Sequence, residues 1–292
     1  MAAASIASSS CRRRTRRSGA LVPLAAAPYM EAMSNRTFPS FFLSHGSPTL
    51  ALEPGAADAF WKELGESLAR PDAVLCISAH WMTAAPLLGA AERPKTIHDY
   101  YGFPEPMYRL SYPAPGAPAL AQRAADLLRA AGIEAALDQR YGLDHGAWVP
   151  LRSLYPAADM PVAQLSVQPR RDARWHYRLG RALEPLRREG VLVLASGGAT
   201  HNLRELDWSD GPPPGWATEF DDWLAERLAA GQTEELLDWE RAPHALRAHP
   251  SPEHFLPLFV GLGAAGKGAR GERLYRDFTM GGLSMAAYRF SA

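Results

Sequence analysis

The chain has 292 residues, and its 31 Lys and Arg residues balance its 31 Asp and Glu residues, so the formal net charge is zero. This balance argues against a general nucleic-acid binder and a polybasic membrane-surface protein, because both need a basic excess. Only two cysteines are present, Cys11 and Cys76, which excludes a disulfide framework and a thiolate zinc site. Any metal must therefore be held by histidine and carboxylate side chains. No apolar run is long enough to span a bilayer.

Residues 1–36 differ in composition from the rest of the chain. They are rich in Ala, Ser and Arg, include the run CRRRTRR at 11–17, and carry no acidic residue among the first 30. Such a composition is compatible with an organelle transit peptide. We favour an upstream extension of the reading frame, because Met30 and Met33 offer starts close to the first predicted strand. We therefore expect an N-terminal extension over 1–36, one domain over 37–292, and a cytoplasmic protein, with organelle targeting as the alternative.

Short apolar runs and helical patterns alternate along the remaining chain. Continuous apolar runs rich in β-branched residues are typical of strands buried on both faces. Four such runs lie at 41–43, 74–77, 161–167 and 191–194. Helical spacing predicts helices over 117–131, 172–189 and 216–230, each followed by a glycine that can end it. The alternation predicts a single α/β domain with a central, largely parallel or mixed sheet flanked by helices.

A histidine follows three of the predicted strands. These histidines are His45, His80 and His201. In open α/β sheets, ligands bind at the carboxyl ends of the strands, so imidazoles from distant parts of the sequence can converge there. Neutral imidazole is a common ligand of transition metals. The pattern therefore predicts a metal site at the C-terminal edge of the strands.

A fourth histidine could complete this site. His254 lies in the segment SPEHFLPL, where Ser251 could cap a helix with Pro252 at its first position. His254 would then lie in the first helical turn. The adjacent Glu253 could replace it as a carboxylate ligand, or could simply favour the positive end of the helix dipole.

Two further histidines lie in predicted loops. His145, in LDHGAW, is either a turn residue or an acid/base group that Asp144 orients. His98, in TIHDYYGFP, lies in an aromatic-rich loop that could form the wall of a pocket for a planar substrate. The same loop could instead pack down on its own aromatic rings. The residues alone leave both alternatives open.

Seven motifs, taken together and in this order, resemble one enzyme family. They are HGSP at 45–48, SAHW at 78–81, TIHDYYGFP at 96–104, YPAPG at 112–116, LDHGAW at 143–148, HNLR at 201–204 and PEHFLPL at 252–258. The family is the 4,5-DOPA extradiol dioxygenases, a LigB-like branch of the class III extradiol ring-cleavage dioxygenases. The resemblance runs from about Phe38 to the end of the chain and does not include residues 1–36.

The resemblance implies a mononuclear non-haem metal, with Fe(II) for catalysis and Zn(II) also found bound, and dioxygen as co-substrate. On the matching positions, His45, His80 and His254 would be metal ligands. His201 matches a position described as a fourth ligand or as the catalytic base. His145 matches a second active-site histidine that handles dioxygen or protons.

Better-known class III members use two histidines and a glutamate, which leaves the choice between Glu253 and His254 open; we favour His254. A catechol would bind the metal through both oxygens, with His98 as a substrate contact, and its ring would open beside the diol to give a coloured semialdehyde. We therefore expect residues 37–292 to be the catalytic domain of an extradiol dioxygenase acting on a small DOPA-like catechol. The alternatives are a zinc-dependent hydrolase on the same scaffold and a metal-binding protein without catalysis.

Overall fold

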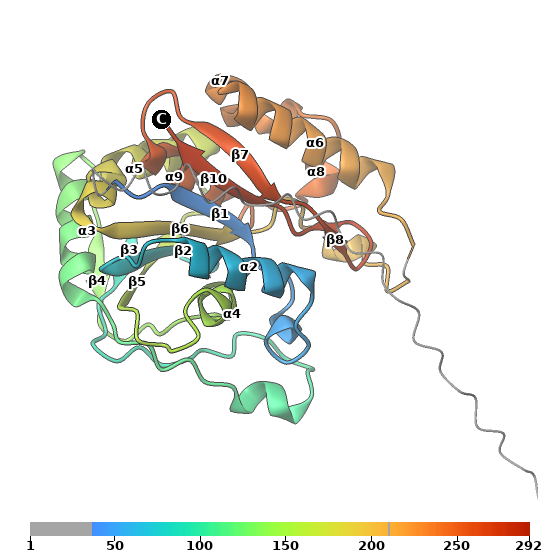
Figure 1. Ribbon diagram of the computed structural model, residues 1–292. Helices are drawn as coiled ribbons and strands as arrows, with labels where there is room; N and C mark the ends of the chain where they lie inside the picture. The colour runs from blue at the N-terminus through green and yellow to red at the C-terminus, as the bar shows by residue number, and fades with distance from the viewer. Residues whose placement is uncertain (1–36, 210) are drawn as a thin grey trace, which may run out of the picture.

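Eight strands form one mixed sheet, and helices cover both of its faces (Figure 1). The computed structural model describes residues 37–209 and 211–292, so the predicted extension over 1–36 lies outside the described residues. The strand order is β4-β3-β5-β2-β6-β1-β10-β7. The strands are β1 (Ser40–Ser44), β2 (Ala73–Met82), β3 (Leu87–Gly89), β4 (Ala136–Asp138), β5 (Val162–Val167), β6 (Val191–Gly197), β7 (Arg270–Tyr275) and β10 (Ala287–Ser291). A separate two-stranded hairpin joins β8 (Phe278–Thr279) to β9 (Leu283–Ser284).

The four predicted strands form the centre of the sheet. They are β1, β2, β5 and β6, and they run parallel in the order β5-β2-β6-β1. The strands β10 and β7 extend this core antiparallel beyond β1, and β3 pairs antiparallel with β5. The prediction of an α/β domain with a largely parallel or mixed sheet is therefore confirmed.

The helices and 3₁₀ turns connect these strands. The α-helices are α2 (Ala56–Ser67), α3 (Pro118–Ala130), α4 (His145–Leu154), α5 (Ala173–Leu183), α6 (Gly215–Ala230), α7 (Thr233–Leu237), α8 (Ala245–Ala248) and α9 (Leu256–Ala265). The 3₁₀ turns are η2 (Pro48–Ala51), η3 (Glu105–Arg109), η4 (Glu184–Glu189), η5 (Leu203–Glu205) and η6 (Trp239–Arg241). In the described part of the chain, no helix is both long and apolar enough to cross a membrane.

The three predicted helices are present, with one change of geometry. They are α3, α5 with η4, and α6. Gly190 and Gly231 end the second and third in the left-handed conformation, as expected of glycine caps. The predicted helix over 172–189 changes from α to 3₁₀ geometry at Glu184, because Pro185 has no backbone N–H to continue the α-helical hydrogen bonds.

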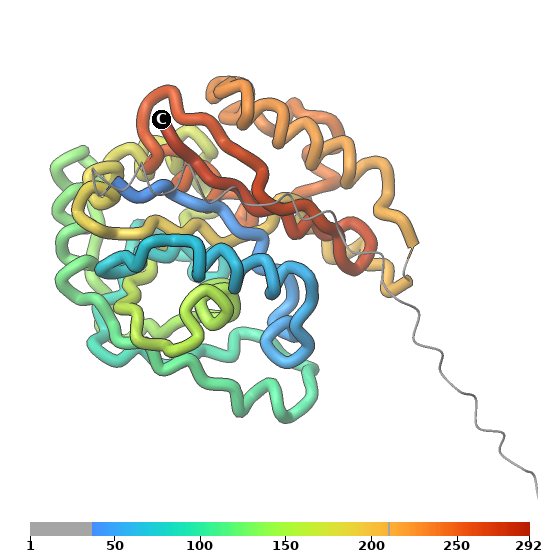
Figure 2. The backbone as a smooth tube through the Cα atoms, viewed as in Figure 1, coloured from blue at the N-terminus to red at the C-terminus, as the bar shows by residue number. Residues whose placement is uncertain are grey.

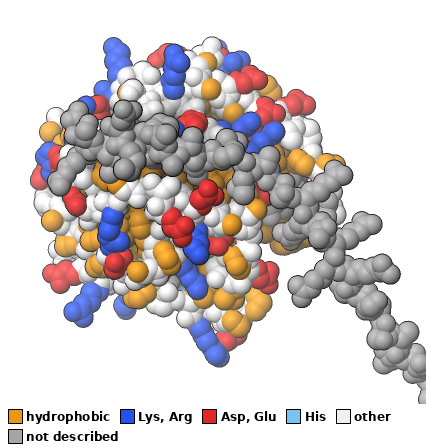
Figure 3. All heavy atoms as spheres, in the orientation of Figure 1, with side chains coloured by type: hydrophobic (Ala, Val, Ile, Leu, Met, Phe, Trp, Pro, Cys, Tyr) orange, Lys and Arg blue, Asp and Glu red, His pale blue; other side chains and the backbone are white. Residues whose placement is uncertain are grey.

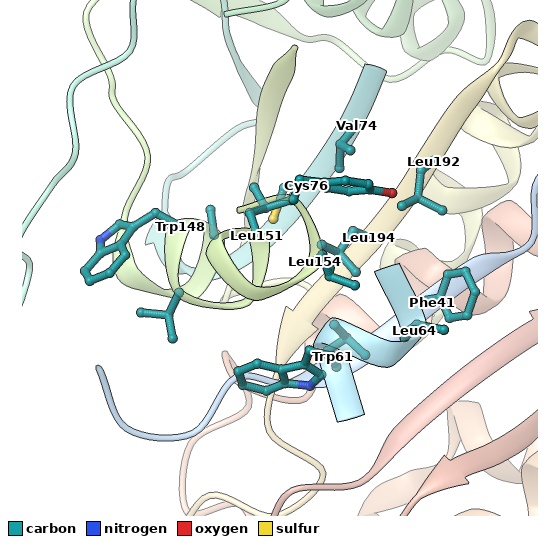
Figure 4. Packing of buried hydrophobic residues seen from close by; sticks show 14 of the residues in the cluster. Phe41, Trp61, Leu64, Val74, Cys76, Trp148, Leu151, Leu154, Leu192 and Leu194 are labelled. Atoms are coloured by element: carbon teal, nitrogen blue, oxygen red, sulfur yellow. The ribbon is translucent and has the colours of Figure 1, made fainter. Parts of the chain in front are cut away.

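Alternate residues of the central strands pack against different helices. On one face, Trp61 of α2 and Trp148 of α4 belong to the same buried cluster as Val74, Cys76 and Leu192 (Figure 4). On the other face, the intervening residues of β2 and β6 pack with α3, α5 and α9. Because both faces are buried, the strand sequences are apolar at consecutive positions.

On the face that Figure 3 shows, basic and acidic side chains are interspersed, in keeping with the balanced charge of the sequence.

Between β3 and α3, residues 90–117 form a long connection that passes beside α4 (Figure 2). There the indole nitrogen of Trp148 donates to the carbonyl oxygen of Ile97 at 3.0 Å. This connection brings its side chains to the carboxyl edge of the sheet.

Candidate metal centre

Three histidines from separate parts of the chain bring their Nε2 atoms together. His45 directly follows β1, His80 lies near the end of β2, and His254 lies just before α9. The Nε2 atom of His80 is 3.0 Å from that of His45 and 3.3 Å from that of His254. The strands β1, β6 and β2 are parallel neighbours, so the cluster lies at the carboxyl edge of the central sheet, where the sequence predicted a site.

Local features of the backbone allow this convergence. The parallel pairing of β2 with β5 is interrupted between Ile77 and Met82, which frees the stretch that contains His80. At the end of β6, a Cβ atom on Gly197 would lie 2.1 Å from the carbonyl oxygen of His254. Only glycine therefore lets the segment before α9 approach the strand this closely.

The Nδ1 atom of each of the three imidazoles faces an oxygen atom. The pairs are His45 with Ser196 Oγ (3.0 Å), His80 with Asp99 Oδ2 (3.3 Å) and His254 with Glu253 Oε1 (3.1 Å). The Ser196 hydroxyl donates its own proton to the carbonyl oxygen of Gly146, so it accepts from His45. Carboxylates can only accept. These contacts favour the hydrogen on each Nδ1, which leaves the Nε2 of His80 with a lone pair toward the Nε2 atoms of His45 and His254.

Burial keeps these imidazoles neutral. His45 and His254 are buried, and burial first, then the neighbouring histidines, holds their pKa values well below the usual 6.5. Burial likewise lowers the pKa of His80 to about 3, although the charge of Asp99 acts in the opposite direction. Neutral imidazole is the form that binds metals.

His201 lies beside this trio, four residues after the end of β6. Its ring stacks on that of His254, with centroids 3.4 Å apart and planes 7° apart. One of its ring nitrogens lies within 4.8 Å of ligand atoms of Glu253 and His254. Burial lowers the pKa of His201 to about 4.

His145 begins the helix α4, where the sequence predicted a loop. Asp144 is the N-cap of this helix, and its side chain accepts from the backbone N–H of Ala147. The hypothesis that Asp144 orients the imidazole is wrong, because Asp99 occupies that place: its Oδ1 lies 3.0 Å from His145 Nδ1. The rings of His145 and His80 have centroids 3.9 Å apart, so His145 adjoins the trio.

Asp144 instead holds the start of α4 against the sheet. Its carboxylate is buried and accepts from the hydroxyl of Ser78 at 2.6 Å, the hydroxyl of Tyr141 at 3.1 Å and the amide of Gln164. A Cβ atom on Gly146 would lie 2.5 Å from Ser78 Oγ, so glycine is needed for this close approach. Asp144 thus fixes the first turn of α4 beside β2.

His98 lies in the connection between β3 and α3, partly buried. Its Nε2 is 2.9 Å from the carbonyl oxygen of Leu110, and its ring lies 5.8 Å from Tyr100 and 6.3 Å from Trp148. Tyr100 and Phe103 therefore pack within the loop, as one of the two alternatives predicted, whereas Tyr101 is 92% exposed. Tyr100 in turn lies 5.7 Å from the ring of His145, so the aromatic loop borders the site. The contact of His98 with a substrate stays a prediction.

The segment around His254 differs from the expected helix start. The helix α9 begins at Leu256, with Pro257 in its first turn, so His254 precedes it. Ser251 does not cap a helix there; its hydroxyl donates to the Glu253 carboxylate at 3.0 Å. The predicted cap is therefore wrong. Pro257 fits the first turn of α9, since proline loses no hydrogen bond there.

Two residues of the site escaped the sequence analysis. Asp99 contacts two of the histidines, and Ser196 contacts a third. Hydrogen bonds from His145 outweigh the effect of burial, which alone would raise the pKa of Asp99, and lower it to about 2. The available signals were the carboxylate inside TIHDYYGFP and the polar residue at the end of a strand that is otherwise apolar.

Comparisons with known proteins identify the family. Residues 39–291 match the family described as the catalytic LigB subunit of aromatic ring-opening dioxygenase. Over 261 residues the chain is 46% identical to a 4,5-DOPA dioxygenase extradiol of Portulaca grandiflora. The match covers 87% of this chain and 96% of the relative. The chain is 44% identical over 237 residues to one of Escherichia coli K12, covering 80% and 87%. The crystal structure of an uncharacterized E. coli K12 protein superposes with a TM-score of 0.74 at 37% identity, covering 86% of this chain and 98% of that one.

The family match spans nearly all of the described chain, and the relatives are similar over almost their whole length. The resemblance seen in the seven motifs is thereby confirmed, and nothing in the comparisons favours a hydrolase or a protein without catalysis. The chain belongs to the LigB family of aromatic ring-opening dioxygenases and is an enzyme of the extradiol type.

Proposed function

We propose that this protein opens the aromatic ring of a DOPA-like catechol beside its two hydroxyl groups, with dioxygen as co-substrate, at one divalent metal ion held by His45, His80 and His254. The observation that carries the proposal is the approach of the His80 Nε2 atom to within 3.0 Å of His45 Nε2 and 3.3 Å of His254 Nε2. The names of the relatives support DOPA as the substrate class. We propose Fe(II) as the catalytic metal and Zn(II) as an alternative occupant.

The spacing of the donor atoms fits a single ion. Two nitrogen atoms that each lie about 2.1 Å from one ion are about 3.0 Å apart at a right angle and about 3.4 Å apart at the tetrahedral angle. The observed separations are 3.0 and 3.3 Å. Imidazole nitrogen suits both iron and zinc, and the oxygen partner on each Nδ1 fixes the tautomer that such ligands need.

The metal, when bound, would hold both catechol oxygens and dioxygen and favour the deprotonated catechol, because three neutral ligands leave its charge uncompensated. His201 is neutral at physiological pH, since its pKa is about 4, and a ring nitrogen can accept the second hydroxyl proton. The Nδ1–H of His145 is held by Asp99, which leaves its Nε2 free to take up a proton and release it. A protein that merely bound metal would not need this oriented imidazole beside its ligands.

The experiment is anaerobic reconstitution with Fe(II) or Zn(II), followed by aeration with DOPA, catechol, protocatechuate or caffeate. We expect the Fe(II) form to consume one O₂ for each ring opened, with visible absorbance of the semialdehyde, and to consume none without a catechol. The metal-free protein is the control. No oxygen uptake across the whole panel would contradict the proposal and favour the zinc-dependent hydrolase.

A further inference from the structure

Asp99 contacts two different parts of the site. Its Oδ1 accepts from both the backbone N–H and the Nδ1–H of His145, each at 3.0 Å, while its Oδ2 lies 3.3 Å from His80 Nδ1. Its side chain is only 21% exposed. We propose that Asp99 is a positioning residue that fixes, with one carboxylate, both the ligand His80 and the proton-transfer residue His145. This inference rests on the proposed function.

The chemistry of a carboxylate explains why one residue can serve both rings. It can accept hydrogen bonds on both oxygens and donates none, so its hydrogen bond with His145 places the hydrogen of that ring on Nδ1, and its 3.3 Å contact with His80 favours a hydrogen on Nδ1 there as well. The Nε2 atom of His80 then presents a lone pair toward His45, and the Nε2 atom of His145 is free for proton transfer. Asp99 also satisfies the backbone N–H at the start of α4, where negative charge is favourable.

The surrounding loop is anchored on both sides of Asp99. Before it, the backbone N–H of Ile97 donates to the carbonyl oxygen of Leu143 at 2.7 Å. The ring of His98 is held by the carbonyl oxygen of Leu110, and the hydroxyl of Tyr100 donates to the carbonyl oxygen of Met107 at 2.9 Å. The backbone on both sides of Asp99 is therefore anchored within the loop and to the segment before α4.

The substitution Asp99→Asn separates the two tasks. The backbone N–H of His145 can only donate, so the amide oxygen should stay with His145. The amide NH₂ group then faces the Nδ1 of His80, donor against donor. His80 must move its hydrogen to Nε2 to accept this hydrogen bond, and it thereby loses the lone pair that a metal needs. Asp99→Ala removes the acceptor from both rings.

The experiment measures Zn(II) affinity by competition with a chelator, melting temperature, and turnover at Fe(II) concentrations that saturate each variant. We expect Asp99→Asn to bind Zn(II) about 10–100-fold more weakly, the usual effect of losing an outer partner of a metal ligand. Its turnover at saturating metal should fall less than that of Asp99→Ala, because the amide oxygen can still accept from His145. Asp99→Ala should lose Zn(II) affinity to a similar extent and should also turn over at least about 10-fold more slowly at saturating metal.

The control is Asp172→Ala, which removes an N-cap of α5 that contacts Trp175 and no residue of the site. It should lower the melting temperature and leave Zn(II) affinity and turnover unchanged. Parental Zn(II) affinity in both Asp99 variants, or losses no larger than those of the control, would overturn the inference. Zn(II) affinity needs neither catechol nor dioxygen. A parent that binds Zn(II) but opens no ring would therefore refute the proposed function and still leave the contact with His80 tested.

Discussion

An oxygen atom beside each Nδ1 distinguishes this site from an ordinary cluster of histidines. The Glu253 carboxylate lies 3.1 Å from the Nδ1 of His254, so the geometry suits an oriented His254 ligand better than a glutamate ligand. The sequence alone could not decide between these adjacent residues, because the direction of each side chain depends on where α9 begins.

A pair of variants tests this assignment. His254→Ala removes one of the three Nε2 donors, so we expect the metal to be lost on dialysis against a chelator. Glu253→Gln leaves the donor in place and should weaken binding about 10–100-fold at most. Metal content after dialysis, measured at matched protein concentration, separates the two. Retention of metal by His254→Ala together with its loss from Glu253→Gln would make Glu253 the ligand.

The proton-transfer role of His145 gives a second prediction. His145→Ala should keep the metal and bind catechol, because the three Nε2 donors are intact. Its turnover should fall by roughly 10²–10⁴-fold, the usual contribution of a general acid or base. Metal content, melting temperature and turnover are measured on one preparation. The surface residue His244 is the control, replaced by Asn because its φ of 58° suits Asn better than Ala. Turnover within a few-fold of the parent would refute the role.

Sequence reasoning predicted that His45, His80 and His201 would meet at the strand edge. The structure joins the first two to His254 and stacks His201 against that ring. The role of Asp99 could not be predicted, because the connection over residues 90–117, which has no periodicity, carries it to His145. Contacts that arise only when such a loop folds leave no spacing signal in the sequence.

At the scale of elements, burial decided which strands and helices were predictable. The central strands are buried on both faces and therefore read as apolar runs, whereas β7 mixes exposed and buried residues and was not predicted. The sequence predicts a loop at the start of helix α4 because of Gly146, and Pro150 inside the helix also disfavours it. Its burial along nearly the whole length and the Asp144 cap outweigh these propensities.

The junction between β5 and α5 predicts a pH dependence of stability. His176 is fully buried; its Nδ1 donates to the carbonyl oxygen of Asp172, and its Nε2 accepts from the backbone N–H of Gln168. Burial lowers its pKa to about 4 from the usual 6.5. Between these two values the unfolded chain binds a proton that the folded chain does not, so stability falls as the pH falls from 6.5 towards 4.

Removing this group should flatten the response. Between pH 7.5 and 5, the free energy of unfolding of the parent should fall by about 2 kcal/mol more than that of His176→Gln, as the cited pKa difference requires. Gln can keep the acceptor for the backbone N–H of Gln168. Urea unfolding at both pH values gives the comparison, with all other histidines common to both proteins. Equal losses in the two proteins would show that His176 is not the group responsible.

At the scale of the whole molecule, the topology explains why the site lies where it does. The parallel neighbours β1, β6 and β2 occupy the middle of the sheet, so their carboxyl ends meet between the helical layers. The alternation of apolar runs and helical patterns predicted this class of fold. The antiparallel extension by β10 and β7 was not predicted, because pairing at an edge depends on how the end of the chain returns to the sheet.

Metal stoichiometry tests the central claim, a single metal site built from these strand-edge histidines, most directly. The parent and the double variant His45→Ala, His80→Ala are each loaded with Fe(II) or Zn(II) under anaerobic conditions, desalted and analysed for metal. Circular dichroism verifies that both proteins are folded. We predict one metal ion per chain in the parent and none retained in the double variant. Full occupancy in a folded double variant would contradict the assignment.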